Sequence, residues 1–169
     1  PGGLRNLDSQ PLALTTNGGT TVSRAGVVET PLTGGWLLRF PPDWGAPDSA
    51  RMAALRSWSE SDVPGIRFFS GTVTYHTTFA APGPERPGER TYLDLGALRE
   101  VAEAWLNDTP LGITWTKPHR FDVTGRLRPG TNTLRVEVAN TWSNRLTGDA
   151  LRGETYTSTP IRQGVKGIP

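Results

Sequence analysis

The feature that most constrains the fold of this chain is a series of short strand-like segments separated by Gly- and Pro-rich breaks. Its 20 Gly and 15 Pro residues fall between short runs of Val, Thr, Tyr and Trp. In the second half of the chain, turn signals recur about every 8 to 12 residues, a spacing typical of all-β sandwiches. We therefore predict an all-β protein, a jelly-roll β-sandwich, rather than an α/β fold.

The length indicates one domain. A chain of 169 residues is long enough to bury its own core and too short for two comfortable domains. We expect an N-terminal extension with strand candidates over 1–31, a β-sandwich over 32–159 and a tail over 160–169. Within the extension, Asn17-Gly18-Gly19 is a hairpin signal between strand candidates at 12–15 and 20–28.

The body of the domain shows strand patterns and little helical pattern. The segment 48–58 carries Met52 and Leu55 at helical spacing and predicts one or two helical turns, the one short helical segment that we expect. Tight turns are expected at Asn107-Asp108 and Pro129-Gly130, and a surface loop at 81–88. The expected strands are 35–40, 66–69, 72–80, 90–95, 101–107, 110–114, 120–123, 131–139 and 154–159.

Composition argues against several classes of partner. The 18 basic and 16 acidic side chains leave a net charge of +2, and the basic residues are scattered, so we expect no nucleic-acid partner. No apolar run has the roughly 20 residues needed to span a bilayer, so we expect no membrane partner. Without cysteine, the core alone must hold the fold. The chain opens without a signal-like segment, as expected of a mature protein or an excised domain.

A polar and aromatic cluster follows the strand over 131–139. Leu134, Val136 and Val138 alternate with polar residues, and the alternation stops after Ala139. Sugars present flat C–H faces rimmed by hydroxyls, so their binding sites combine aromatic rings with planar polar groups. One interpretation is a carbohydrate-binding edge; the alternative is that the Trp caps the core while the Arg and Asp form an ion pair that fixes the loop. The cluster consists of Trp142, Asn144, Arg145 and Asp149.

A second candidate surface lies on the strand over 101–107. Alternation places Val101, Glu103 and Trp105 on one face of that strand. This face is a sugar platform, an interface with a neighbouring domain, or ordinary half-buried surface. Trp115, just beyond the next strand, is either a stacking residue on a loop or a cover for the end of the sandwich.

Catalytic and metal chemistry receive less support. Glycosidases need two carboxylates, and Glu103 and Glu137 can meet on neighbouring strands, but any sandwich with 16 acidic residues offers such pairs. We expect no catalysis by this chain. His76 and His119 are isolated and do not predict a zinc site. A structural calcium is possible in sandwiches of this type, but no loop is rich enough in Asp to place it.

Several sequence blocks, in this order and spacing, carry a family resemblance: 35–40, 55–58, 69–75, 92–96, 101–107, 121–124 and 140–149. Together they resemble the sugar-binding-type β-sandwich found beside the catalytic domain in glycoside hydrolases of the family-two kind. They are most similar to the C-terminal sandwich of the family 106 α-L-rhamnosidases. The Asn-x-Trp-x-Asn-Arg-Leu-x-Gly-Asp run from Asn140 to Asp149 is the most specific block. Asn107-Asp108 departs from the Asn-Gly turn expected there.

The resemblance implies a galactose-binding-like jelly roll without catalytic machinery of its own. We therefore expect a non-catalytic, carbohydrate-binding-like module of a secreted or periplasmic glycoside hydrolase that acts on rhamnose-containing polysaccharide. Its partners would be that carbohydrate and the catalytic domain of the parent enzyme. The alternative is a structural module that packs on the catalytic domain through Trp105, Trp115 and Trp142 and contacts no sugar.

Overall fold

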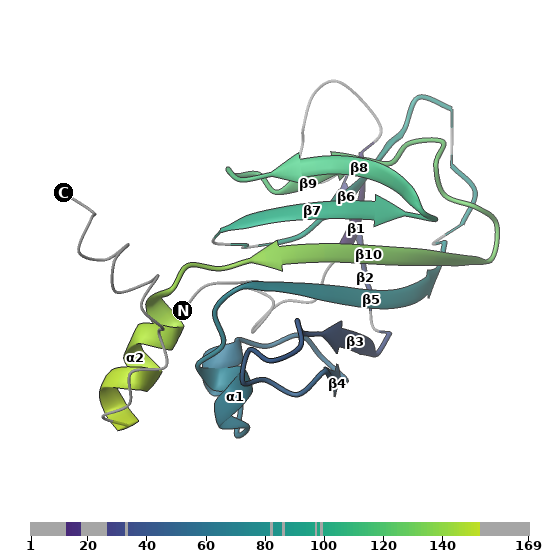
Figure 1. The fold of residues 1–169 in the computed structure, drawn as a ribbon. Coiled ribbons are helices and arrows are strands. Elements are labelled where there is room, and N and C mark those ends of the chain that lie inside the picture. Colours follow the sequence, from purple (N-terminus) through teal and green to yellow (C-terminus); the bar gives the residue numbers. More distant parts are fainter. Residues whose placement is uncertain are drawn as a thin grey trace.

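The structure is a computed structural model that describes residues 13–17, 27–32, 34–81, 83–85, 87–96, 98 and 100–152, with the backbone alone for 13–17 and 27–29. Two antiparallel sheets form a sandwich, and Figure 1 shows the larger sheet in front of the smaller one. The smaller sheet has the order β2 (Val27–Pro31), β1 (Ala13–Asn17), β6 (Arg90–Asp94), β9 (Arg120–Asp122). The larger, six-stranded sheet has the order β4 (Ser49–Met52), β3 (Trp36–Arg39), β5 (Thr72–Ala80), β10 (Thr131–Ala139), β7 (Val101–Leu106), β8 (Thr109–Thr114). The predicted all-β sandwich is confirmed.

The core fills the space between the two sheets. Along β10, Leu134, Val136 and Val138 are buried while the residues between them face outward, as the alternation predicts. The same pattern buries the inward residues of β5 and β7, and from the smaller sheet Leu93 and Phe121. Each fully buried side chain of this size stabilises the fold by about 1.5–3 kcal/mol. The side chains between these inward residues point to the opposite face of the six-stranded sheet.

An aromatic cluster closes one end of the core. The Trp58 indole donates a hydrogen bond to the Tyr75 hydroxyl at 2.5 Å and lies parallel to the Tyr75 ring, with centroids 6.4 Å apart. Phe69 meets Trp58 edge to face at 5.6 Å. Trp36, Trp58 and Tyr75 are buried, as predicted for core positions.

Two predicted segments have the wrong structure. The helical turns expected over 48–58 are wrong, because Ser49–Met52 forms edge strand β4 on β3 and its Met52 is buried. The strand expected over 66–69 is also wrong, since Pro64–Arg67 forms the short helix α1. Proline suits the first turn of a helix because it has no N–H to satisfy. A 3₁₀ turn, η3 (Trp58–Glu60), precedes it.

The segment after β10 is a helix rather than the loop that we expected. Helix α2 (Ser143–Arg152) makes the prediction of one short helical segment wrong in both number and position. Its register brings Arg145 and Asp149 together across one turn, and the Thr147 hydroxyl donates to the Ser143 carbonyl. The polar residues that suggest a loop in the sequence thus lie in a helix, where residues four apart are neighbours. No helix in the described part of the chain is long and apolar enough to cross a membrane.

The predicted turns explain how the strands connect. Asn107 and Asp108 both have positive φ, 50° and 63°, which is the conformation of a type I′ hairpin turn. Asp108 therefore takes the position where we expected glycine. Strands β1 and β2 pair antiparallel, but Asn17 lies opposite Val27, so this register does not correspond to the tight hairpin predicted at Asn17-Gly18-Gly19; residues 18–26 lie outside the described residues. The strand predicted at 154–159 and the tail at 160–169 also lie outside them.

Candidate functional site

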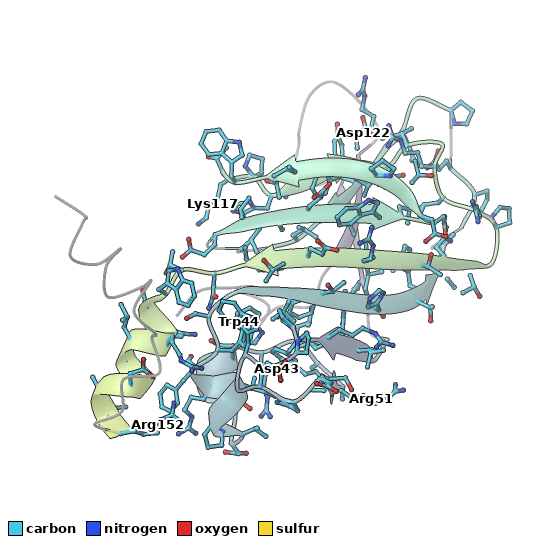
Figure 2. All side chains as sticks on the ribbon, viewed as in Figure 1. Asp43, Trp44, Arg51, Lys117, Asp122 and Arg152 are labelled. Atoms are coloured by element: carbon cyan, nitrogen blue, oxygen red, sulfur yellow. The ribbon has the colours of Figure 1, made fainter. Side chains whose placement is uncertain are left out.

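One row of side chains crosses the outer face of the six-stranded sheet, the face turned away from the smaller sheet. The strand register aligns Arg51 of β4, Leu37 of β3, His76 of β5, Arg135 of β10 and Trp105 of β7. Neighbouring strands lie about 4.8 Å apart, so the row is about 19 Å long at the backbone. Figure 2 shows Arg51 at the β4 end of this row. We call this surface the Trp105 face.

A pocket of about 350 Å³ opens on the Trp105 face. Its size lies at the lower end of the roughly 300–1,000 Å³ typical of small-molecule sites. Apolar and polar groups both line it, as a sugar with one C–H face and several hydroxyls requires. Its side-chain lining includes Leu37, Arg51, His76, Trp105, Asp108 and Arg135.

Arg135 holds the Trp105 ring in place. The guanidinium carbon of Arg135 lies 3.5 Å from the indole centroid, and its Nη1 donates to Glu137 Oε1 at 2.6 Å. A cation–π contact at a partly exposed site contributes about 0.5–1 kcal/mol. Because Glu137 fixes Arg135 and Arg135 fixes the indole, the aromatic group has a defined orientation before any ligand arrives.

His76 occupies the middle of the row. Burial lowers the pKa of its imidazole, and the positive charges of Arg39 and Arg135 lower it further, against the opposing effect of Glu137. A neutral imidazole has one nitrogen that donates and one that accepts a hydrogen bond. At neutral pH His76 can therefore pair with a sugar hydroxyl in either direction.

The predicted pair of Glu103 and Glu137 does meet across neighbouring strands. The two residues are direct partners in the register of β7 and β10, on the same outer face as Trp105. Both are half-exposed on an open sheet, and Glu137 is already ion-paired with Arg135. The two carboxylates therefore lie on an open surface, and one of them is already engaged by an arginine.

The polar cluster after β10 braces helix α2 against the rest of the domain. Arg145 Nε lies 3.5 Å from Asp149 Oδ1, and Arg145 Nη1 donates to the Trp44 carbonyl at 3.2 Å. Its backbone N–H donates to Ser70 Oγ at 2.9 Å. Asn144 and Asp149 are only 8% and 6% exposed. The structure thus places three of the four predicted residues in packing contacts and leaves Trp142 at the surface.

Asn140 connects the segment before α2 to the residues that precede β5. Its Oδ1 accepts from the Gly71 N–H at 2.8 Å, and its Nδ2 donates to the Phe69 carbonyl at 3.0 Å. Gly71 has a φ of 143°, a conformation that L side chains rarely adopt. The geometry of this turn thus depends on one amide and one glycine, which position the start of α2.

Two exposed tryptophans lie together beside α2. The rings of Trp44 and Trp142 have centroids 5.5 Å apart at an interplanar angle of 31°, and the residues are 42% and 39% exposed. Figure 2 shows Trp44 close to α1. Trp115, at the end of β8, is 75% exposed and lies apart from the core. The pairing of Trp44 with Trp142 was not predicted, because nearly a hundred residues separate the two in the chain.

Helix α2 packs closely against Phe68, the residue that follows α1. A Cβ added to Gly148 would lie 2.6 Å from Phe68 Cγ, far inside van der Waals contact. Gly148→Ala should therefore lower the free energy of unfolding by about 1–2 kcal/mol, because overpacking of about 1–3 kcal/mol exceeds the helix-propensity gain of up to about 1 kcal/mol. Urea denaturation measures this change. Thr147→Ala, at an exposed position of the same helix, should change it by less than about 0.5 kcal/mol; an equal loss in both variants would refute the tight fit.

No metal site emerges from the residues that the structure describes. Among them, no group of three or more His, Asp or Glu side chains comes together as metal ligands would. His76 and His119 lie in different parts of the sandwich, and Thr114 Oγ1 is 3.0 Å from His119 Nδ1. The structural calcium considered for sandwiches of this type therefore remains unassigned among the described residues.

Comparison with known proteins agrees with the fold. The family model for the glycosyl hydrolase 2 galactose-binding domain-like family matches residues 64–165. A putative β-glucuronidase of Formosa agariphila is 41% identical over 119 residues, which are 70% of this chain and 10% of that protein. The chain thus spans about a tenth of the length of that curated relative.

Solved structures show the same similarity. The rhamnosidase from Novosphingobium sp. PP1Y superposes with a TM-score of 0.69 and 39% identity, over 77% of this chain and 12% of that one. The β-glucuronidase of Bifidobacterium dentium, complexed with coumarin-3-O-glucuronide, has a TM-score of 0.51 and 30% identity, over 64% of this chain and 20% of that one. The jelly-roll sandwich, the ordered blocks and the family match give one conclusion: the chain belongs to the galactose-binding-like domain family of the glycosyl hydrolase 2 type.

Proposed function

We propose that this chain is a non-catalytic carbohydrate-binding module of a secreted glycoside hydrolase that acts on rhamnose-containing polysaccharide. The observation that carries the proposal is the pocket on the Trp105 face, where an oriented indole lies beside an imidazole and two guanidinium groups. The rhamnose expectation draws support from the 39% identity with the Novosphingobium rhamnosidase. The non-catalytic role draws support from the open, ion-paired setting of Glu103 and Glu137.

The Trp105 face has the properties of a rigid binding surface. Its row of side chains runs across five strands of the six-stranded sheet, from edge strand β4 to β7, and sites on strands hold their geometry better than sites on loops. Arg135 sets the orientation of the ring, so little side-chain entropy is lost when a sugar binds. The pocket can therefore bind a sugar unit without rearrangement of the backbone.

Binding measurements with one aromatic variant test this function. Isothermal titration should detect binding of a rhamnose-containing oligosaccharide to the chain, and Trp105→Ala should weaken it at least about tenfold, since an aromatic stacking contact contributes on the order of 1.4 kcal/mol. Trp115→Ala is the matched control because that ring is 75% exposed and does not line the pocket. Equal weakening by both substitutions, or no binding of any polysaccharide, would refute the proposal.

A second candidate function is docking on the catalytic domain of the parent enzyme. The observation in its favour is the exposed pair of Trp44 and Trp142. Hydrogen bonds of Arg145 to the Trp44 carbonyl and of Asn140 to the Phe69 carbonyl fix the backbone beside this pair. Exposed aromatic pairs of this kind are enriched at protein interfaces. In the full-length enzyme, Trp142→Ala should then lower thermal stability and leave polysaccharide retention unchanged. Reduced retention with unchanged stability would instead favour a role of Trp142 in sugar contact.

A further inference from the structure

We infer that the Trp105 face selects a sugar that carries a carboxylate, that is, a uronic acid unit. This inference rests on the proposed carbohydrate-binding function and adds the chemical class of the bound sugar.

The charges around the pocket are unevenly distributed. Among the described residues, neither Arg39 nor Arg51 forms a salt bridge, although both lie on this face. Arg135 is already neutralised by Glu137 at 2.6 Å. Asp108, the acidic residue that lines the pocket, comes from the turn after β7, at the Trp105 end of the row. The β4 end of the pocket is therefore positive, and no salt bridge within the described part of the chain neutralises Arg51.

His76 reports the same positive potential. It lies in the middle of the row, between Leu37 of β3 and Arg135 of β10 in the register. After burial, the largest influences on its pKa are the charges of Arg39 and Arg135, and both disfavour the imidazolium. A carboxylate bound near Arg51 would offset this potential.

Shape and charge together give the bound sugar an orientation. In an oligouronate, one sugar unit would contact Trp105, and the carboxylate of a following unit would reach past His76 towards Arg51, because the row is longer than a single sugar ring. A carboxylate matches the planar guanidinium of arginine because two parallel N–H donors reach its two oxygens. Such charge-assisted hydrogen bonds are about twice as strong as neutral ones.

The test uses one ligand in two charge states. Isothermal titration at low ionic strength compares an oligouronate with the same oligosaccharide after reduction of its carboxyl groups to alcohols. We expect the oligouronate to bind about tenfold more tightly, the factor expected for one charge-assisted contact. Arg51→Gln should abolish that preference while binding of the reduced ligand is retained. Arg126→Gln removes an exposed arginine of the connection between β9 and β10 and should leave the preference intact.

Each outcome has one meaning. Equal affinity for the two ligands, with loss of both in Trp105→Ala, would overturn the carboxylate selection and leave the proposed carbohydrate binding standing. If the chain bound neither of the two ligands and no neutral polysaccharide, both the carboxylate selection and the proposed carbohydrate binding would be overturned. A sulfated oligosaccharide of similar length serves as a third ligand: tighter binding of the sulfated ligand than of the oligouronate would overturn the assignment to a carboxylate. A preference for the oligouronate that survives Arg51→Gln would overturn the assigned site.

Discussion

Replacing Trp58 with alanine is expected to lower the free energy of unfolding by about 3–5 kcal/mol, which is the usual cost of removing a buried Trp side chain. The residue is 1% exposed, stacks on Tyr75 and meets Phe69 edge to face. It also ties the connection that contains η3 and α1 to central strand β5. The loss is therefore both a cavity in the core and the release of a connecting segment.

Urea denaturation followed by Trp fluorescence and circular dichroism measures this change. Trp115→Ala is the control, because it is the same substitution at a residue that is 75% exposed. It should change the free energy of unfolding by less than about 0.5 kcal/mol. Trp58→Phe retains an aromatic ring and loses the hydrogen bond to Tyr75, so its loss should be smaller than that of the alanine variant. If Trp58→Ala and Trp115→Ala were equally stable, the described core would be wrong.

Replacing Asn132 with alanine is expected to lower the free energy of unfolding by about 3 kcal/mol. Each buried polar group that is left without a partner costs about 1–3 kcal/mol. Asn132 is fully buried, and its Oδ1 accepts from the Arg128 N–H at 2.9 Å and from Asn107 Nδ2 at 2.7 Å. Its Nδ2 donates to the Arg128 carbonyl at 2.9 Å. Asn107 in turn accepts from the Thr133 N–H at 3.0 Å.

The same substitution should also weaken sugar binding, because the turn that Asn107 anchors carries Asp108 into the pocket. Chemical denaturation gives the stability and titration with an oligosaccharide gives the affinity. Asn132→Asp retains one acceptor but sets a carboxylate oxygen against the Arg128 carbonyl in a buried site, so it should not restore the lost stability. Thr131→Ala, at an exposed neighbouring position of β10, should alter neither quantity. An alanine variant as stable as the native chain would contradict the described network.

Alternation made most of the strands predictable from the sequence. In β5, β7 and β10 every second residue is buried, so the period of two identified both the strand and its inner face. The shared outer face of Glu103 and Trp105 followed from that period alone. The Asn107-Asp108 turn was predictable because both residues tolerate positive φ better than most others.

The helices were less predictable because tertiary contacts decide them. Met52 and Leu55 are spaced as in a helix, but pairing of Ser49–Met52 with β3 satisfies the backbone and buries Met52. In α2, the glycine at position 148 lowers helix propensity by about 1 kcal/mol relative to alanine, which favoured a loop. The close approach of Phe68 explains why glycine is required there.

The candidate site was predictable only in part. Sequence reasoning identified Trp105, but Arg51, His76 and Arg135 lie on three other strands, and only strand order brings them into one row. The sequence offered one signal: Leu37, His76 and Arg135 each alternate with core residues along their strands, which places them on the outer face. Without the order of the strands, this signal does not show that they are neighbours. Conversely, the polar run from Asn140 to Asp149 resembles a recognition loop, whereas the structure uses most of it to fix α2.

The most direct test of the account is a nuclear magnetic resonance titration that follows the indole N–H signals of the six tryptophans during addition of an oligosaccharide. Sugar binding on the Trp105 face should shift the Trp105 signal progressively to saturation, while the signals of the buried Trp58 and of Trp142 stay unchanged. Saturable shifts confined to Trp44 and Trp142, with Trp105 unchanged, would contradict it and would place the carbohydrate contact beside α2.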